Sequence, residues 1–142
     1  MLASVVLEEL DCNIQHPCST SVSAVQAEIL VSFDIDGTLE FGDPPGPITA
    51  SMVLKTREAG YVIGTSSDRP RSAQIRIWGQ IGVEPDFVGH KHELDKVRDA
   101  YSASRRLHIG DTNMDRHYAE LHGFEYVDVT ELPEAGSEGW IY

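Results

Sequence analysis

The sequence predicts an α/β protein built on a three-layer, doubly wound and mostly parallel sheet. Short apolar runs typical of buried strands alternate along the chain with segments in which apolar residues recur at helical spacing. Such alternation favours a parallel sheet with helices on both faces. In sheets of this kind the ligand crevice lies at the carboxyl ends of the strands, and several polar clusters of this sequence directly follow the apolar runs.

Five runs are predicted to be strands from their length and their branched apolar or aromatic content. They cover residues 29–33, 61–65, 86–89, 107–109 and 126–129. Val22, Val25 and Ile29 have helical spacing, and they predict a turn of helix that leads into the first strand.

Four helices are predicted from apolar residues at helical spacing, over residues 48–59, 70–81, 94–101 and 114–121. Gly60, Gly82 and Gly123 follow three of them as stop signals, and Pro70 opens the second as a first-turn proline. The buried stripe of that second helix is expected to contain Ala73, Ile77, Trp78 and Ile81.

A single catalytic domain is predicted for residues 28–142, preceded by an N-terminal extension over residues 1–27. The extension contains a run of helical appearance at residues 2–10. It also contains Cys12 and Cys18, whose spacing matches neither a paired zinc motif nor a thioredoxin-like motif. No basic targeting signal is expected, and reduced thiols without a membrane-length apolar stretch favour a cytoplasmic protein.

The charge of the chain limits its partners. The net charge is −12, from 11 Lys and Arg against 23 Asp and Glu. Nucleic acids and anionic membranes repel such a chain unless a local basic patch intervenes, so neither is expected as the main partner.

Two carboxylates and a glycine follow the first predicted strand, in the stretch Asp34-Ile35-Asp36-Gly37-Thr38. If the extended geometry persists, both carboxylates face the same side, because side chains alternate along a strand. Like charges this close repel each other unless a cation lies between them or one of them holds a proton. The pair predicts a metal ion, an acid–base role or both, and capping of a helix or turn is the alternative.

Hydroxyl groups follow the second predicted strand, in Thr65, Ser66 and Ser67, just ahead of Arg69 and Pro70. Hydroxyls and backbone N–H groups gathered at a helix N-terminus form a ready site for phosphate. Simple capping of the helix uses the same groups, and the two roles are compatible.

A lysine follows the third predicted strand. Lys91 comes directly after the strand, whereas Lys96 lies one turn into the next predicted helix, where it can reach solvent. Position therefore favours Lys91 as the cation that faces the site. His90 and His92 flank this lysine, and we interpret them as loop residues.

Two more carboxylates, Asp111 and Asp115, follow the fourth predicted strand in the stretch GDTNMD. One helical turn separates them, so both lie on one face. Together with Asp34 and Asp36 they make a set of four acidic residues after strand ends. Such an oxygen-rich set favours a hard cation, Mg²⁺ in particular.

In this order the motifs resemble those of the haloacid dehalogenase-like superfamily of aspartate-nucleophile phosphohydrolases. The resemblance covers about residues 29–129, and its specific parts are DIDGT and GDTNMD. It implies a phosphatase that hydrolyses phosphate monoesters, of a substrate that the sequence does not identify. The hydrolysis would pass through an aspartyl-phosphate on Asp34.

The resemblance also implies roles for the other carboxylates. Asp36 would protonate the leaving oxygen, later activate water, and offer its backbone carbonyl to the metal. Mg²⁺ on Asp34, Asp36 and Asp111 would shield the attacking carboxylate from the phosphate, and Asp115 would support the metal.

For the phosphoryl group the resemblance implies Lys91, Arg69 and a hydroxyl at the end of the second strand. The run SDRP aligns Ser67 with that hydroxyl. Ser66 is the close alternative, and Thr65 is a distant one.

Members of the superfamily usually cover the site with a cap domain, and here both insertion points are too short to hold one. We therefore expect an open crevice with Phe41 near its rim. The 40–47 loop, the N-terminal segment, a large substrate or the neighbouring subunit of a homodimer would cover it.

Three other functions stay open. One is a phosphotransferase or mutase of the same superfamily. Another is a phosphoacceptor domain of the response-regulator type, which would place its accepting aspartate after a later strand. The third is an inactive scaffold.

Overall fold

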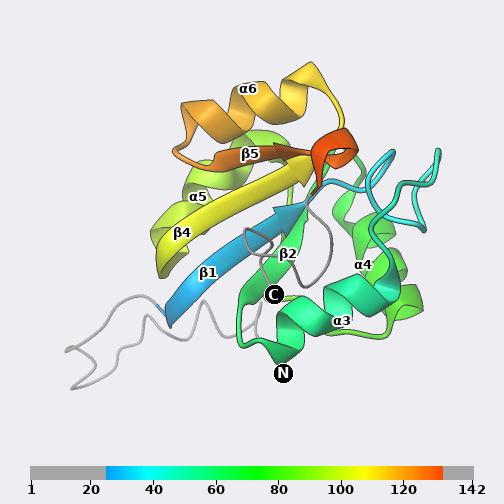
Figure 1. Cartoon of the computed structure of the whole chain (residues 1–142), viewed down its shortest axis with the longest axis horizontal. Coiled ribbons are helices and arrows are strands. Elements are labelled where there is room, and N and C mark those ends of the chain that lie inside the picture. The colour runs from blue at the N-terminus through cyan, green and yellow to red at the C-terminus, as the bar shows by residue number, and fades with distance from the viewer. Residues whose placement is uncertain (1–24, 133–142) are drawn as a thin grey trace.

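The computed structural model describes residues 25–132. Within them a single sheet holds the strands β1 (Val25–Phe33), β2 (Val62–Ser66), β3 (Phe87–Gly89), β4 (Tyr101–Gly110) and β5 (Glu125–Asp128). The strand order is β3-β2-β1-β4-β5, and every neighbouring pair is parallel (Figure 1). The predictions made for residues 2–10, Cys12 and Cys18 lie outside the described residues.

Helices connect the strands. They are α3 (Ala50–Glu58), α4 (Arg71–Ile81), α5 (Leu94–Ala100) and α6 (Asn113–Leu121), with 3-10 turns at Lys91–Glu93 and Val129–Glu131. The predicted order of alternating strands and helices is confirmed for these residues, and most boundaries differ from the prediction by one or two positions.

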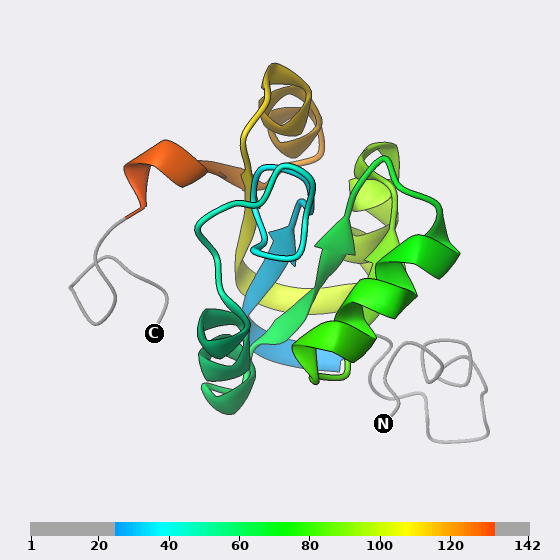
Figure 2. The same cartoon turned by 90° about the vertical axis from the view of Figure 1, so that its right-hand side faces the viewer.

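Alternating residues of β1 divide the core into two halves. Val31 and Phe33 pack in the half that includes Val53 of α3 and Ile77 of α4. Leu30 belongs to the other half, with apolar residues from α5, α6 and their flanking segments. Figures 1 and 2 show the same arrangement, with α3 and α4 on one side of the sheet and α5 and α6 on the other. The three-layer prediction is therefore confirmed.

The start of β1 corrects the predicted helical turn. β1 begins at Val25, where it pairs with Tyr101, and the pairing continues through Ile29 and Arg105. The spacing of three apolar residues is a weak helical signal, and pairing with a long neighbouring strand outweighs it.

The prediction for β4 was also too short, and Tyr101 begins this strand instead of lying on the preceding helix. Only the segment from Leu107 onward pairs with β5. Within residues 25–132 the earlier part pairs with β1 alone, and several of its side chains are exposed. Polar residues are tolerated there, and a prediction based on runs of apolar residues therefore misses this part of the strand.

The buried residues of two helices differ from what their apolar spacing suggests. In α4, Ile77, Trp78 and Ile81 are buried as expected, but Gln74 is fully buried while Ala73 is only partly so. In α6 the apolar residues that mark the helix include Met114 and Leu121, which are exposed, and the buried residues are Asp115 and Ala119.

The chain reverses direction across the sheet next to β1. It runs outward from β1 through β2 to β3, and then crosses to β4 on the other side of β1. The carboxyl ends of β1 and β4 therefore flank the point where ligands bind in doubly wound sheets. Figure 2 looks toward these ends, and the loop after β1 lies over them.

The connections beside this point are short. Residues 34–61 contain α3 and a loop with one isolated bridge between Leu39 and Ile48, and α4 is the only helix of residues 67–86. Across residues 25–132, no helix has the length and apolar character that crossing a membrane requires.

Candidate active site

Asp34 lies at the end of the central strand. Its backbone N–H donates to the carbonyl of Ile109 at 2.9 Å, so pairing with β4 continues one residue beyond β1. Its side chain is buried, and the Thr38 hydroxyl donates to Oδ2 at 3.4 Å. The backbone thus fixes Asp34 at the carboxyl end of β1.

Three carboxylates meet here from two strand ends. Asp34, Asp111 and Asp115 each offer an oxygen, and these oxygens all lie within 4.8 Å of one another. Asp34 and Asp115 are buried, while Asp111 is exposed to solvent. Buried carboxylates this close need a cation or a shared proton, so the set fits a hard divalent metal.

Two glycines make room for these carboxylates. Gly37 has a φ of 78°, and a Cβ at this position would lie 1.9 Å from Oδ2 of Asp111. A Cβ on Gly110 would lie 2.3 Å from Cγ of Asp115. Each of these glycines therefore leaves space for a carboxylate of the stretch GDTNMD, which explains why these positions require the smallest residue.

Lys91 supplies positive charge to the cluster. Its Nζ lies 3.3 Å from Asp115, 3.6 Å from Asp34 and 3.7 Å from Asp68, and its side chain is only 6% exposed. Burial lowers the pKa of this amine, but attraction to the carboxylates outweighs that effect, so the pKa of Lys91 is raised. Lys96, by contrast, is 76% exposed.

The environment of Asp34 disfavours its charged form in the absence of metal. Burial, followed by repulsion from Asp115, raises the pKa of Asp34 to about 8, although Lys91 acts in the opposite direction. A divalent cation between the carboxylates would relieve the same repulsion. This is the electrostatic reason why the cluster fits Mg²⁺.

Asp115 is fixed by its neighbours. Its Oδ2 accepts from the backbone N–H and the hydroxyl of Thr112 and from the backbone N–H of Asp111. Nε2 of His108 lies 2.7 Å from Oδ1. Burial acts to raise the pKa of Asp115, but the contacts with His108, Lys91 and Thr112 outweigh it and lower the pKa. These contacts fix the orientation of the Asp115 carboxylate, which also caps the N-terminus of α6.

A buried polar chain lies beneath the carboxylates. The Ser32 hydroxyl donates to Oγ of Ser66 at 2.8 Å and lies 2.9 Å from Nδ1 of His108, whose other ring nitrogen contacts Asp115. All four side chains are fully buried. The sequence analysis missed Ser32 and His108, because they lie within strands and contact each other across 76 positions of the chain.

Asp36 is not part of the cluster formed by Asp34, Asp111 and Asp115. Nε and an Nη of Arg69 donate to its carboxylate, the shortest contact being 2.7 Å, and the backbone N–H of Asp43 donates to it as well. Hydrogen bonds from Arg69 hold the pKa of Asp36 below its usual value. The structure thus brings Asp36 together with Arg69, while Asp34, Asp111 and Asp115 converge with Lys91.

The three hydroxyls after β2 have different partners. Thr65 donates to Gln74 and accepts from the indole N–H of Trp78, so both bonds face the core. Ser66 belongs to the buried chain with Ser32. Ser67 accepts from the backbone N–H of Arg69 at 3.0 Å. That bond leaves the hydroxyl proton of Ser67 available to a ligand.

Gln74 ties the loops around the site together. Its amide nitrogen donates to the carbonyls of Arg69 and Gly89, both at 2.9 Å, and its oxygen accepts from Thr65. These bonds hold the Ser67–Arg69 loop against the turn that carries Lys91. This role was not predictable from the sequence, because a glutamine on a helix is usually exposed.

Two further features concern the loop after β1 and a hollow away from the carboxylates. Phe41, in the loop after β1, is partly buried against the main core. A hollow of about 740 Å³ lies elsewhere, against α4 and the segment before β3, and Ile75, Trp78 and Pro85 are among its lining residues. None of the three carboxylates lines it, so we place the candidate chemistry at the strand ends.

Comparisons with protein-family models, with curated proteins and with solved structures give no match to this chain.

Proposed function

We propose that the protein is a Mg²⁺-dependent phosphatase of the haloacid dehalogenase-like type, which hydrolyses phosphate monoesters. The observation that supports this most directly is the convergence of Asp34, Asp111 and Asp115 beside the buried amine of Lys91. It occurs at the reversal point of a parallel sheet, where such folds bind their ligands.

Asp34 is the proposed nucleophile. Its carboxylate oxygen forms a bond to phosphorus as the bond to the leaving oxygen breaks, and water then attacks phosphorus to release phosphate and restore Asp34. Bound Mg²⁺ supplies the positive charge that lets an anionic carboxylate approach an anionic phosphate. Asp34 and Asp111 would hold it, with Asp115 in support and the backbone carbonyl of Asp36 as a further ligand.

Ser67, Lys91 and Arg69 are proposed to bind the phosphoryl oxygens. Among the three hydroxyls after β2, Ser67 is favoured because of its partner. Thr65 bonds to core side chains and Ser66 accepts from the buried Ser32, whereas Ser67 accepts from the loop that carries Arg69. A bound phosphate would compete with Asp36 for the hydrogen bonds of the Arg69 guanidinium. Phosphate binding would weaken the Arg69–Asp36 pair.

Weakening that pair prepares Asp36 for its proposed acid role. Arg69 stabilises the charged carboxylate and holds the pKa of Asp36 low, so a loosened contact raises this pKa. Asp36 can then hold the proton that the leaving oxygen needs, and afterwards accept a proton from the attacking water. The Arg69–Asp36 pair therefore links phosphate binding to acid catalysis.

A phosphate-release assay tests the proposal. The full chain is incubated with an aryl phosphate and a panel of phosphate esters, with Mg²⁺ and after chelation. We expect release that chelation abolishes and Mg²⁺ restores, and Asp34→Asn should remove it while the fold persists. A folded, metal-replete protein that releases nothing from the whole panel would contradict the proposal.

Two other outcomes of the same assay identify the alternatives. A stable phosphoprotein without turnover indicates a phosphoacceptor domain. Transfer of the phosphoryl group to an added alcohol in preference to water indicates a phosphotransferase.

A further inference from the structure

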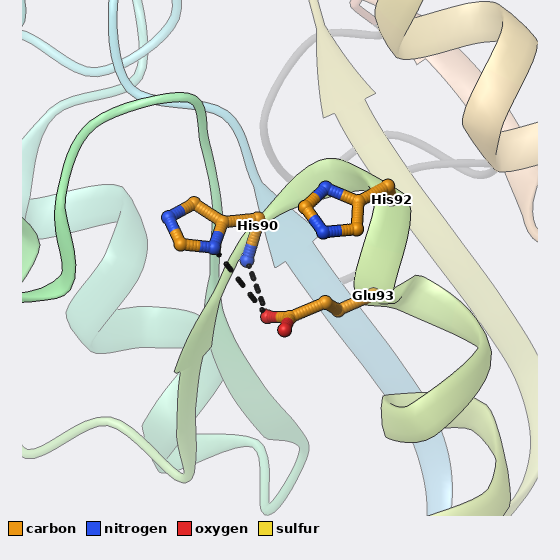
Figure 3. A group of neighbouring side chains, drawn as sticks. All are labelled: His90, His92 and Glu93. Carbon is orange, nitrogen blue, oxygen red and sulfur yellow. Dashed lines mark hydrogen bonds and ion pairs between the residues drawn. The ribbon is translucent and has the colours of Figure 1, made fainter.

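The turn that carries Lys91 also holds a second group of side chains of the metal-ligating types. His90, His92 and Glu93 each offer a ligand atom, and these atoms all lie within 4.8 Å of one another (Figure 3). Lys91, which lies between the two histidines in the sequence, is buried. His92 is exposed, and His90 and Glu93 are partly buried. The group is therefore accessible from solvent.

Glu93 is positioned before any metal arrives. Its Oε1 accepts from Arg71 at 2.6 Å and from the backbone N–H of His90 at 3.1 Å. Its Oε2 lies 3.8 Å from the exposed amine of Lys96. Metal-binding carboxylates commonly have one oxygen held by hydrogen bonds in this way, which leaves the other oxygen to bind the ion.

The two imidazoles lie side by side. Their ring planes are parallel within 3°, with centroids 5.6 Å apart, and Nδ1 of His90 is 3.6 Å from Oε1 of Glu93. Ligand atoms at zinc distances of about 2.1 Å lie about 3.4 Å apart around a tetrahedral ion. The ligand atoms here lie within 4.8 Å of one another, and the exposed side chain of His92 has room to move.

We propose that His90, His92 and Glu93 form a site for Zn²⁺ or a similar late transition metal, separate from the carboxylate cluster. Two imidazoles and one carboxylate suit Zn²⁺, Co²⁺, Ni²⁺ and Cu²⁺, whereas Mg²⁺ prefers oxygen ligands alone. The two groups of ligands therefore select different metals. Bound at this site, the ion fixes the 3-10 turn Lys91–Glu93 and with it the backbone of Lys91.

The test is a Zn²⁺ titration by calorimetry in excess Mg²⁺, on the full chain with Cys12→Ser and Cys18→Ser to remove competing thiols. We expect one Zn²⁺ per chain. His92→Ala should weaken binding by about tenfold or more, since even losing a partner of a metal ligand costs this much. His117→Ala is the matched control, because His117 is an exposed histidine on α6. It should bind as the parent does.

Asp111→Asn separates the two metal sites. Zn²⁺ binding that persists in Asp111→Asn and weakens in His92→Ala supports the proposal. Binding that weakens in Asp111→Asn but not in His92→Ala places Zn²⁺ on the carboxylates and overturns it, and so does the absence of binding to the parent. As a readout that needs no variant, Zn²⁺ should shift the ring signals of His90 and His92, but not those of His117, in NMR spectra.

Discussion

Two neighbours shift the pKa of Asp34 in opposite directions: Asp115 raises it and Lys91 lowers it. Asp115 repels a charge on Asp34, while the Lys91 amine stabilises charge on both carboxylates. Lys91 therefore links the stability of the metal-free site to its proposed function, because the same amine would contact the phosphoryl oxygens.

Replacing Lys91 with methionine should abolish phosphatase activity and destabilise the metal-free protein by about 3 kcal/mol or more, since buried carboxylates lose their cation. Denaturant unfolding and the phosphate-release assay measure the two effects. Lys96→Met is the control, and it should change stability by less than about 0.5 kcal/mol because Lys96 is exposed. A far larger activity loss in Lys96→Met than in Lys91→Met would reverse the assignment.

The pKa of Asp34 predicts how pH changes the effect of Mg²⁺. Between its ordinary value of 3.8 and the native value of about 8, the folded protein holds a proton that the unfolded chain has released. Metal-free stability contributed by this group therefore falls as pH rises through that range. Mg²⁺ displaces the proton, so it should raise Tm more at pH 8 than at pH 6.

Thermal unfolding with and without Mg²⁺ at the two pH values checks this expectation. Asp34→Asn should lose most of the pH dependence of the Mg²⁺ effect, because an amide does not titrate in this range. An equal Mg²⁺ effect at both pH values in the parent protein would contradict the proposed role of Asp34 as a metal ligand.

At the residue scale, sequence could predict the groups that belong to local motifs. Asp34, Asp111 and Asp115 were found because each follows a predicted strand end, and the structure places them together. Ser32 and His108 could not be found in this way. Their contact depends on the register of β1 against β4, where Ser32 lies opposite His108.

At the scale of elements, α4 connects two sides of the site through Gln74. Its side chain bonds to the end of β2, to the following loop and to the end of β3. Sequence predicted the helix and its apolar stripe, but a pattern of apolar residues does not reveal a buried amide. The same limitation hid the first half of β4, whose polar residues lie beside a single neighbouring strand.

Gln74→Ala should destabilise the protein by about 3 kcal/mol, because buried partners of the amide lose their hydrogen bonds. Urea unfolding measures the change. Gln80→Ala is a matched control on the exposed side of the same helix, and it should stay within about 0.5 kcal/mol of the parent. Equal stability of Gln74→Ala and Gln80→Ala would show that the amide does not hold the loops together.

At the scale of the whole molecule, the strand order gathers residues that are distant in the chain. The reversal beside β1 brings the end of β4 next to the end of β1. Asp34 and Asp111, which are 77 positions apart in the chain, therefore lie together at one edge of the sheet. Alternation of strands and helices was enough to predict this architecture. The exact strand order was not predictable from the sequence, because it depends on pairing between distant segments.

The central claim is that Asp34 accepts the phosphoryl group, and trapping that group tests it most directly. Asp36→Asn protein is mixed with an aryl phosphate and Mg²⁺, quenched in acid, and digested for mass spectrometry. An aryl leaving group departs without a proton donor, so the variant should form the phosphoenzyme but break it down slowly. We predict one phosphoryl group per chain, on Asp34. A phosphoryl group on another residue, or turnover by Asp34→Asn at the parent rate, would contradict the claim.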